Sequence, residues 1–365
     1  MLLFRETIQP WAPWRDSMSP ATAILEEDTL FMDKSMEQLP LLELSIVIIS
    51  FNTRELLRQC LQSVSEEATG IPHEILVVDN ASGDGSAEMV AEEFPNIRLF
   101  CSDVNLGFGN ANNVALKHAQ GRYFVLLNSD AFLAKGALAG AIRHMDAHPD
   151  CAVGGGLLVG DDGAHQPSAR TFHSVLNDAI VFSGLAAKFP KSKMFGRFDR
   201  TWADPLIPAQ VDWVPGAFSI VRPEALRRVG LFDPDFFLYY EEVDLCLRLK
   251  RAGYRVWYWP DIVITHIGGE SSKQLTSLEF STGAAQVVLW RMRGTLLYYR
   301  KHQGVGVHLA YWMEWTLNSL AVLRNSFSAT PYRKERKRHY STLLALLKQA
   351  WNDTNGGRIS PPQPW

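Results

Sequence analysis

The chain has 365 residues, enough for one large domain or two of medium size, and its 47% hydrophobic and 21% charged residues suit a globular protein. The net charge of −3 argues against nucleic acid as a partner. Four scattered cysteines without a CxxC pair argue against a zinc site and fit a reducing cytosol. Met1–Pro20 lacks the basic and apolar segments of a signal peptide, so we expect a cytoplasmic protein.

Residues 1–40 show no clear period, and we expect an N-terminal arm there. Beyond the arm, short β-branched runs alternate with amphipathic patterns. The expected strands are Leu44–Ser50, Glu74–Val78, Ile97–Cys101 and Tyr123–Leu127, and the expected helices follow Thr53, begin at Ser86 and end at Gly121. This alternation predicts an α/β fold with a doubly wound, mostly parallel sheet.

Polar residues follow three of these strands. Asn52, Asp79 and Asp130 stand at the strand ends, with Asn105 and Asn112 between the third strand and the fourth. Such residues often serve only as turn formers. In a parallel sheet, however, ligands bind at the carboxyl ends of the strands, and three such residues together favour a binding site.

A cluster of acids follows the aromatic run Phe236–Tyr240. Glu241, Glu242 and Asp244 open a helix that we expect to end at Gly253. Acids at this position can simply stabilise a helix start through its dipole. Carboxylates this close also resist ionising together, so that one of them can acquire a raised pKa and act as a base.

The middle of the chain is less regular. We expect a long loop region over 161–193, a short helix opened by Pro223 and closed by Gly230, and two strands, Arg255–Trp259 and Ile262–Thr265. His266 follows the last strand. With the carboxylate of Asp130 it could bind Mg²⁺ or Mn²⁺, although a lone histidine is more often packed or hydrogen-bonded.

The C-terminal part is basic and helical by composition. Between Arg291 and Lys348, eleven Lys and Arg residues face two acids, Glu314 and Glu335, giving +9. Glu314 would cost a membrane-spanning helix about 2.5 kcal/mol or more. Tyr311, Trp312 and Trp315 instead suggest a helix in the membrane interface, the alternative being a helical cap on the domain. We expect residues 281–365 to form a helical, basic extension, with membrane association as one of these two alternatives.

Six segments carry a family resemblance. They are IVIISFNTRELLRQCLQSV (46–64), ILVVDNASGDGS (75–86), NLGFGNANN (105–113), FVLLNSDA (124–131), the run from Val214 to Asp261, and HIGG (266–269). In this order the chain resembles the family 2 glycosyltransferases of the GT-A fold, in their rhamnosyltransferase-like branch. The resemblance implies a GT-A domain over residues 41–280.

The resemblance also implies an inverting, metal-dependent transfer from a nucleoside-diphosphate sugar to a saccharide, with Mg²⁺ or Mn²⁺ as cofactor. Asp79 would contact the pyrimidine base. Asp130 takes the place of the last acid of the family's Asp-x-Asp metal motif, Asn128 replaces the first, and His266 matches its metal-site histidine. The expected nucleotide pocket is Ser50, Asn52, Asp79, Asn80, Asn105, Asn112 and Ser129, and the expected sugar and acceptor region is Trp213, Gly216 and Ala217.

The expected base is Glu242, which stands where the family has an aspartate, so its carboxylate reaches one methylene further. Glu241 is the competing assignment, and we expect Asp244 to hold the helix or an arginine. A pyrophosphorylase is disfavoured because SFNTRELL, after the first strand, has no glycine-rich phosphate loop. A non-catalytic sugar-nucleotide-binding protein is the remaining alternative.

The branch suggests rhamnose from dTDP-rhamnose as the donor, with a UDP-hexose as the alternative. The expected acceptor is a saccharide in bacterial cell-surface polysaccharide synthesis, either linked to a polyprenyl diphosphate or part of a growing surface polysaccharide. The protein would then work at the cytoplasmic face of the plasma membrane, and a homo-oligomer remains open.

Overall fold

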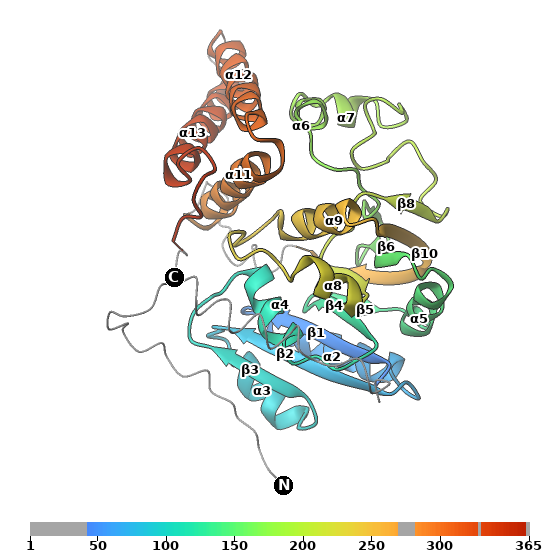
Figure 1. Ribbon diagram of the computed structural model, residues 1–365. Coiled ribbons are helices and arrows are strands. Elements are labelled where there is room, and N and C mark those ends of the chain that lie inside the picture. Colours follow the sequence, from blue (N-terminus) through green and yellow to red (C-terminus); the bar gives the residue numbers. More distant parts are fainter. Residues whose placement is uncertain (1–41, 269–281, 328–329, 363–365) are drawn as a thin grey trace, which may run out of the picture.

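The structure is a computed structural model that describes residues 42–268, 282–327 and 330–362. The expected N-terminal arm and the last glycine of the HIGG segment lie outside these ranges. Figure 1 shows the chain as a twisted sheet with helices packed on it and three long helices at one end.

The first half of the sheet is parallel. β1 (Leu44–Ser50) pairs in parallel with β2 (His73–Asn80) and β4 (Tyr123–Asn128), and β3 (Arg98–Ser102) extends the sheet beyond β2. The register sets Ser50 beside Asp79, so the polar strand ends meet at one edge. The connecting helices are α2 (Arg54–Glu67), α3 (Ser86–Glu93) and α4 (Phe108–Leu116). All four strands are confirmed, but α4 ends at Leu116 rather than Gly121, since 117–118 form a turn.

The second half of the sheet mixes directions, and the sheet order is β3-β2-β1-β4-β9-β6-β10-β5. β9 (Phe218–Val221) runs antiparallel to both β4 and β6 (Cys151–Val159), whereas β10 (Arg255–His266) runs parallel to β6. The short strands β5 (Ala131–Leu133), β7 (His165–Gln166) and β8 (Ala209–Val211) pair antiparallel at the margins. The predicted α/β sheet is confirmed in outline, with β9 as its antiparallel insert.

Two sequence expectations for this half were wrong. The two strands expected on either side of Pro260 are one strand, β10, because a shift of register between Trp259 and Val263 absorbs the proline. The long loop expected over 161–193 contains β7, α6 (Val175–Phe182) and α7 (Leu185–Lys188). The overlooked signal was Ser174, whose side chain accepts a hydrogen bond from the Asn177 amide and caps α6.

The remaining helices of the sheet domain are α5 (Ala137–Ala147), α8 (Pro223–Val229) and α9 (Glu241–Arg251). α8 has Pro223 at its start and Gly230 at its end, as predicted. α9 lies between the sheet and the C-terminal helices (Figure 1), so the acids at its start belong to the middle of the molecule.

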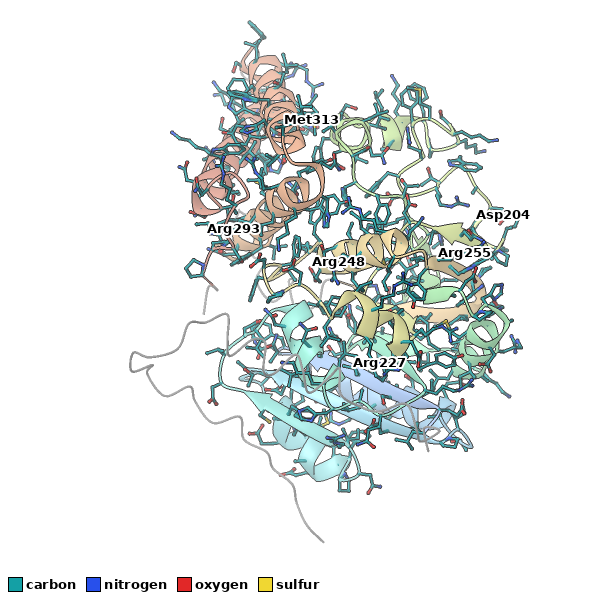
Figure 2. All side chains as sticks on the ribbon, viewed as in Figure 1. Asp204, Arg227, Arg248, Arg255, Arg293 and Met313 are labelled. Atoms are coloured by element: carbon teal, nitrogen blue, oxygen red, sulfur yellow. The ribbon has the colours of Figure 1, made fainter. Side chains whose placement is uncertain are left out.

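The C-terminal helices are α11 (Thr282–Gln303), α12 (Gly306–Ser326) and α13 (Pro331–Asp353). In the described ranges, no helix combines the length and apolarity needed to cross a membrane. The buried side chains of α11 join the core that also contains Phe236 and Tyr240. Arg293 of α11 forms an ion pair with Asp353 at the end of α13, which ties α11 to α13 (Figure 2).

Candidate active site

The loops after β1 and β2 are bonded to each other. The Asn52 amide donates to Ser82 Oγ at 3.0 Å, and the Gly83 amide donates to Asn52 Oδ1 at 2.8 Å. Ser82 in turn donates its amide to Asp79 Oδ2 at 3.0 Å. The other oxygen of Asp79, Oδ1, is buried and has no hydrogen-bond partner among the described residues. Burial raises the pKa of Asp79 despite the hydrogen bonds from Ser82. Asp79 Oδ1 is thus a buried acceptor available to a donor group of a ligand.

The asparagines of the expected nucleotide pocket are bonded to the protein. Asn80 Nδ2 donates to Asn105 Oδ1 at 3.0 Å, and Asn105 Oδ1 also accepts the Gly107 amide at 2.9 Å. These bonds shape the turn into α4. Asn112 is fully buried within α4 and donates to the Phe108 carbonyl at 2.9 Å, so the structure assigns it a packing position.

Three hydroxyl groups connect β1 to β4. Ser50 Oγ lies 3.2 Å from Thr53 Oγ1, which lies 2.7 Å from Ser129 Oγ. Thr53 precedes α2 as expected, but its side chain makes no capping bond because it takes part in this chain of hydroxyls. Ser129 thereby fixes the segment that presents Asp130.

Asp130 and His266 come together. His266 pairs with Ala131 across β10 and β5, and its Nε2 lies 3.5 Å from Asp130 Oδ1. On the other side of the ring, Nδ1 lies 2.9 Å from Gln166 Oε1, and Gln166 Nε2 donates to the His266 carbonyl at 2.8 Å. An Nδ1–H bond to Gln166 leaves the Nε2 lone pair directed at the Asp130 side.

This donor set fits a divalent ion. A carboxylate oxygen and an imidazole nitrogen suit Mn²⁺, and a buried partner on the second ring nitrogen is typical of metal-bound histidines. Within the described ranges no group of three His, Cys, Asp or Glu residues could hold a metal, so further ligands would be water or phosphate oxygens. Gln166 was missed by the sequence interpretation because nothing near it in the sequence points to His266.

Replacing Gln166 with leucine should weaken Mn²⁺ binding by about 10–100-fold, because the imidazole would lose the partner that orients it. Calorimetric titration of Mn²⁺ in the presence of a nucleoside diphosphate measures this affinity. Gln210→Leu, on the exposed side of β8, is the matched control and should bind Mn²⁺ like the parent. Equal affinities for both variants would exclude Gln166 as the residue that positions His266.

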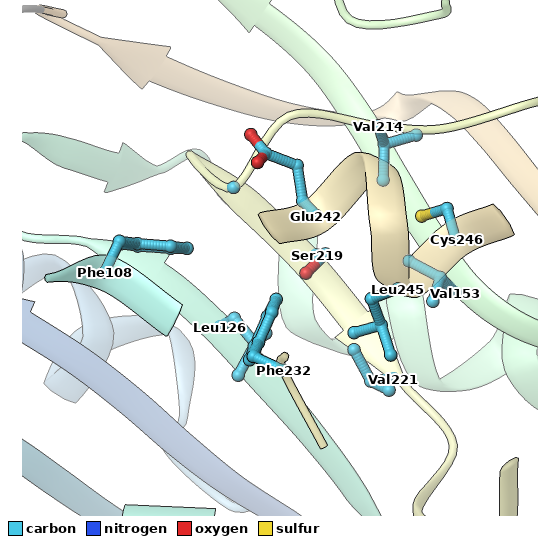
Figure 3. Close-up of a pocket in the computed structure, with 11 residues that line it drawn as sticks. Phe108, Leu126, Val153, Val214, Ser219, Val221, Phe232, Glu242, Leu245 and Cys246 are labelled. Carbon is cyan, nitrogen blue, oxygen red and sulfur yellow. The ribbon is translucent and has the colours of Figure 1, made fainter. Parts of the chain in front are cut away.

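The acceptor region adjoins this segment. The Asn128 amide donates to the Ala217 carbonyl at 3.1 Å, next to the pairing of β4 with β9. Gly216 packs so closely on Phe108 that an added Cβ would lie 2.9 Å from its ring. Gly216 and Phe108 line a small, mostly apolar pocket together with Phe232 and Glu242 (Figure 3). The segment Asn128–Asp130 is therefore joined to the pocket that Glu242 borders by one backbone hydrogen bond, from Asn128 to Ala217.

Trp213 differs from the expectation. Its side chain is buried, its Nε1 donates to the Thr171 carbonyl at 2.9 Å, and Arg170 lies over the ring at 5.0 Å. In this conformation the indole packs inside the protein instead of offering a face to a sugar. The sequence places Trp213 near Gly216, but it does not show that residues from another segment cover the indole.

The two glutamates at the start of α9 have different surroundings. Glu241 is buried next to Gly109 of α4, and burial together with the charge of Glu242 raises its pKa well above the ordinary range. Glu242 borders the pocket, and Figure 3 shows its carboxylate pointing away from Leu245 and Cys246. Burial raises the pKa of Glu242 as well, while hydrogen bonding to the backbone at Glu242 and Gly216 and the charge of Arg170 oppose the rise.

The turn before these glutamates has an unusual backbone. Tyr239 and Tyr240 have φ values of 69° and 73°, a left-handed conformation that costs about 1–3 kcal/mol at each non-glycine residue. Helix α11 supports the turn, because Thr295 Oγ1 donates to Tyr240 Oη at 3.0 Å. An added Cβ on Gly294 would lie 3.0 Å from the Tyr239 carbonyl oxygen, so the helix touches the turn directly.

Asp244 holds α9 in place, as predicted. It accepts hydrogen bonds from Arg248 Nε at 2.7 Å and lies 2.7 Å from His302 Nε2 of α11. Burial alone would raise the pKa of Asp244, but these two partners outweigh it and lower the pKa. The sequence suggested the arginine, four residues away on the same helix, but gave no sign of the histidine.

Comparisons with known proteins agree with this geometry. Residues 45–207 match the model of glycosyl transferase family 2. An N-acetylglucosaminyl-diphospho-decaprenol L-rhamnosyltransferase of Mycobacterium tuberculosis is 26% identical over 81% of this chain and 96% of its own length. Rhamnosyltransferase WbbL of Escherichia coli is 26% identical over 69% of this chain and 91% of its own.

Two solved structures share the fold. The mannosyltransferase PcManGT of Pyrobaculum calidifontis, in complex with GDP-Man and Mn²⁺, has a TM-score of 0.50 at 17% identity and covers 92% of this chain and 95% of its own. GalNAc-T7 with UDP, GalNAc and Mn²⁺ has a TM-score of 0.51 at 14% identity, over 94% of this chain and 68% of its own.

The sheet and its strand-end loops have the GT-A fold of these two structures. More particularly, the chain carries a glycosyl transferase family 2 domain within residues 45–207, as its motifs suggested.

Proposed function

We propose that this glycosyltransferase is inverting and that Glu242 is its base. An acceptor hydroxyl oxygen attacks the anomeric carbon from the face opposite the diphosphate, the bond from that carbon to the diphosphate oxygen breaks, and Glu242 takes the hydroxyl proton. A divalent ion, when bound by Asp130 and His266, supplies positive charge beside the departing diphosphate. The observation that carries the proposal is the Glu242 carboxylate at an apolar pocket, linked through Gly216 and Ala217 to the Asp130 segment.

The donor and acceptor follow from the relatives. Both named relatives are rhamnosyltransferases, and one is named for an N-acetylglucosaminyl-diphospho-decaprenol. We therefore propose dTDP-rhamnose as the donor and a polyprenyl-diphosphate-linked saccharide as the acceptor, at the cytoplasmic face of the membrane during cell-surface polysaccharide synthesis. A UDP-hexose is the alternative donor, because the buried Oδ1 of Asp79 can accept a hydrogen bond from the imide N–H of either uracil or thymine.

A thermal-shift panel tests the donor. The full chain is incubated with dTDP-rhamnose, UDP-glucose and GDP-mannose, each with and without Mn²⁺, and transfer to a polyprenyl-diphosphate saccharide is then assayed with the donor that stabilises it most. The largest shift is expected for dTDP-rhamnose with Mn²⁺. A larger shift with UDP-glucose would select the alternative donor, and no shift or turnover with any donor would favour a non-catalytic protein.

Asp79→Asn should weaken binding of dTDP and UDP by about tenfold, because the buried acceptor for the base would be replaced by an amide that can also donate. Competition with a fluorescent nucleotide measures the loss. Asp103→Asn, an exposed acid just after β3, is the control and should leave nucleotide affinity unchanged. If Asp79→Asn binds both nucleotides as tightly as the parent, Asp79 does not contact the base.

A further inference from the structure

Helix α12 has an unusual distribution of polar and apolar residues. Its buried face carries Glu314, Asn318 and Asn325 beyond the apolar Val307 and Ala310 of its first turns. The opposite face carries six large apolar side chains that are each more than half exposed: Val305, Leu309, Trp312, Leu320, Leu323 and Phe327. We call these six residues the α12 face. A surface helix normally has the reverse arrangement, with the apolar stripe toward the core.

The buried polar residues explain why α12 is stable this way round. Glu314 accepts a hydrogen bond from Arg291 of α11 at 2.9 Å, so its charge is neutralised inside the helix bundle. Asn325 Nδ2 donates to the Ala321 carbonyl of its own helix at 2.7 Å. The ion pair with Arg291 holds this side of α12 toward the interior, and the opposite, apolar side faces outward.

The α12 face is continuous. Its members follow the helical repeat, and Thr316 is the one exposed polar residue in the middle of the stripe. A helix of this length extends about 30 Å at 1.5 Å per residue. A contiguous apolar strip of that size on a water-exposed surface marks an interaction site.

The charges beside the strip identify the partner. Arg324 and the first turns of α13, with Arg333, Lys334, Lys337 and Arg338, are exposed, and Arg333 donates to the Arg324 carbonyl, which joins the basic cluster to the end of α12. The acid within this run is Glu335. A second copy of the face would bring like charges together, whereas anionic lipid headgroups complement them.

We propose that the α12 face lies in the surface of an anionic lipid bilayer, with the basic start of α13 against the headgroups. Trp312 and the neighbouring Trp315 then occupy the interfacial layer that tryptophan prefers. This inference rests on the proposed function insofar as a lipid-linked acceptor would be met at the same membrane.

The position of the face agrees with that use. α12 packs against α6, and α11 supports the Tyr239–Tyr240 turn before Glu242. Figure 1 shows α12, α13 and α6 together at one end of the molecule, with α2 and α3 at the other. A bilayer at the α12 face would therefore lie at the end of the molecule that carries α12, α13 and α6, away from α2 and α3.

Vesicle sedimentation of the full chain tests the proposal. The parent should bind vesicles of phosphatidylglycerol with phosphatidylcholine at least about tenfold more tightly than phosphatidylcholine alone. Leu309→Gln/Trp312→Gln/Leu323→Gln should lose at least about tenfold in binding to the anionic vesicles. Arg333→Gln/Lys334→Gln/Lys337→Gln should lose a similar factor, and its residual binding should depend less on salt than binding of the parent.

The matched control is Val104→Gln/Leu206→Gln/Ile207→Gln, which removes three exposed apolar side chains outside α12 and should bind vesicles like the parent. Unchanged binding by the α12 triple variant, or equal binding of the parent to both kinds of vesicle, would overturn the proposal. So would sedimentation equilibrium showing a lipid-free dimer that the α12 variant dissociates, because a second copy would then cover the face.

Two readouts separate this inference from the proposed function. The α12 triple variant should melt at the parent temperature and keep transfer to a water-soluble saccharide, while losing transfer to an acceptor held in vesicles. If the parent binds anionic vesicles but transfers no sugar, the proposed function fails and the membrane face stands. Equal loss of transfer to both acceptors would contradict a role for the face in membrane docking.

Discussion

Glu242→Gln is expected to lower transfer by about 10²–10⁴-fold while nucleotide binding survives, because glutamine keeps the size of the side chain but cannot accept the acceptor's proton. The pH profile should report the same group. Since the pKa of Glu242 is raised and the base acts as a carboxylate, the rate should increase with pH through a limb above the usual glutamate range. Both expectations can be checked by measuring turnover and nucleotide affinity from pH 5 upward in steps of about half a pH unit.

Glu241→Gln is the matched variant, one residue away in the same helix. Glu241 is buried beside Gly109 and does not line the pocket, so its replacement should affect folding stability more than the pH limb. Near-normal turnover by Glu242→Gln together with loss of turnover by Glu241→Gln would reverse the assignment. Because the pKa of Glu241 is raised further than that of Glu242, Glu241 is neutral where Glu242 titrates, and Glu241→Gln should leave the limb in place.

Gly107→Ala is expected to destabilise the protein by about 4 kcal/mol or more, which is exceptional for a single methyl group. Gly107 has φ +78°, and an added Cβ would lie 2.1 Å from the Phe237 carbonyl oxygen. That oxygen also accepts the Phe108 amide at 3.1 Å, so the backbone cannot move away without losing this bond. Urea unfolding, or the yield of folded protein, measures the effect.

Gly163→Ala is the control because Gly163 has almost the same positive φ without the crowding. Its φ is +77°, and no atom lies within 4 Å of an added Cβ. Gly163→Ala should lower the free energy of unfolding by about 1–2 kcal/mol, which is the effect of the positive φ alone. Similar losses at both positions would show that conformation, and not the contact with Phe237, determines the effect at Gly107.

The meeting of the polar strand ends was predictable because its signals are local. A buried strand followed at once by Asn52, Asp79 or Asp130 requires only that the sheet be parallel, and the pairing of β1 with β2 and β4 brings those strand ends together. The polar residue and the strand that positions it are neighbours in the sequence, so no knowledge of distant contacts was needed.

The parts that could not be predicted depend on distant partners. Gln166 orients His266 from 100 positions away, and Thr295 supports Tyr240 from 55 positions away. Neither residue belongs to a pattern of spacing or hydrophobicity, and side-chain hydrogen bonds of this kind carry no periodic signal. Trp213 failed for the same reason, since the residues that cover it come from other segments.

The contact of α11 with the Tyr239–Tyr240 turn has a consequence for protein engineering. Hybrid enzymes are often made by joining the nucleotide-binding part of one relative to the C-terminal part of another. Here a junction between β10 and α11 would separate Tyr240 from Thr295, and Asp244 from His302. A functional hybrid would have to inherit these pairs as matched sets, so the donor half and the helical tail are not interchangeable modules.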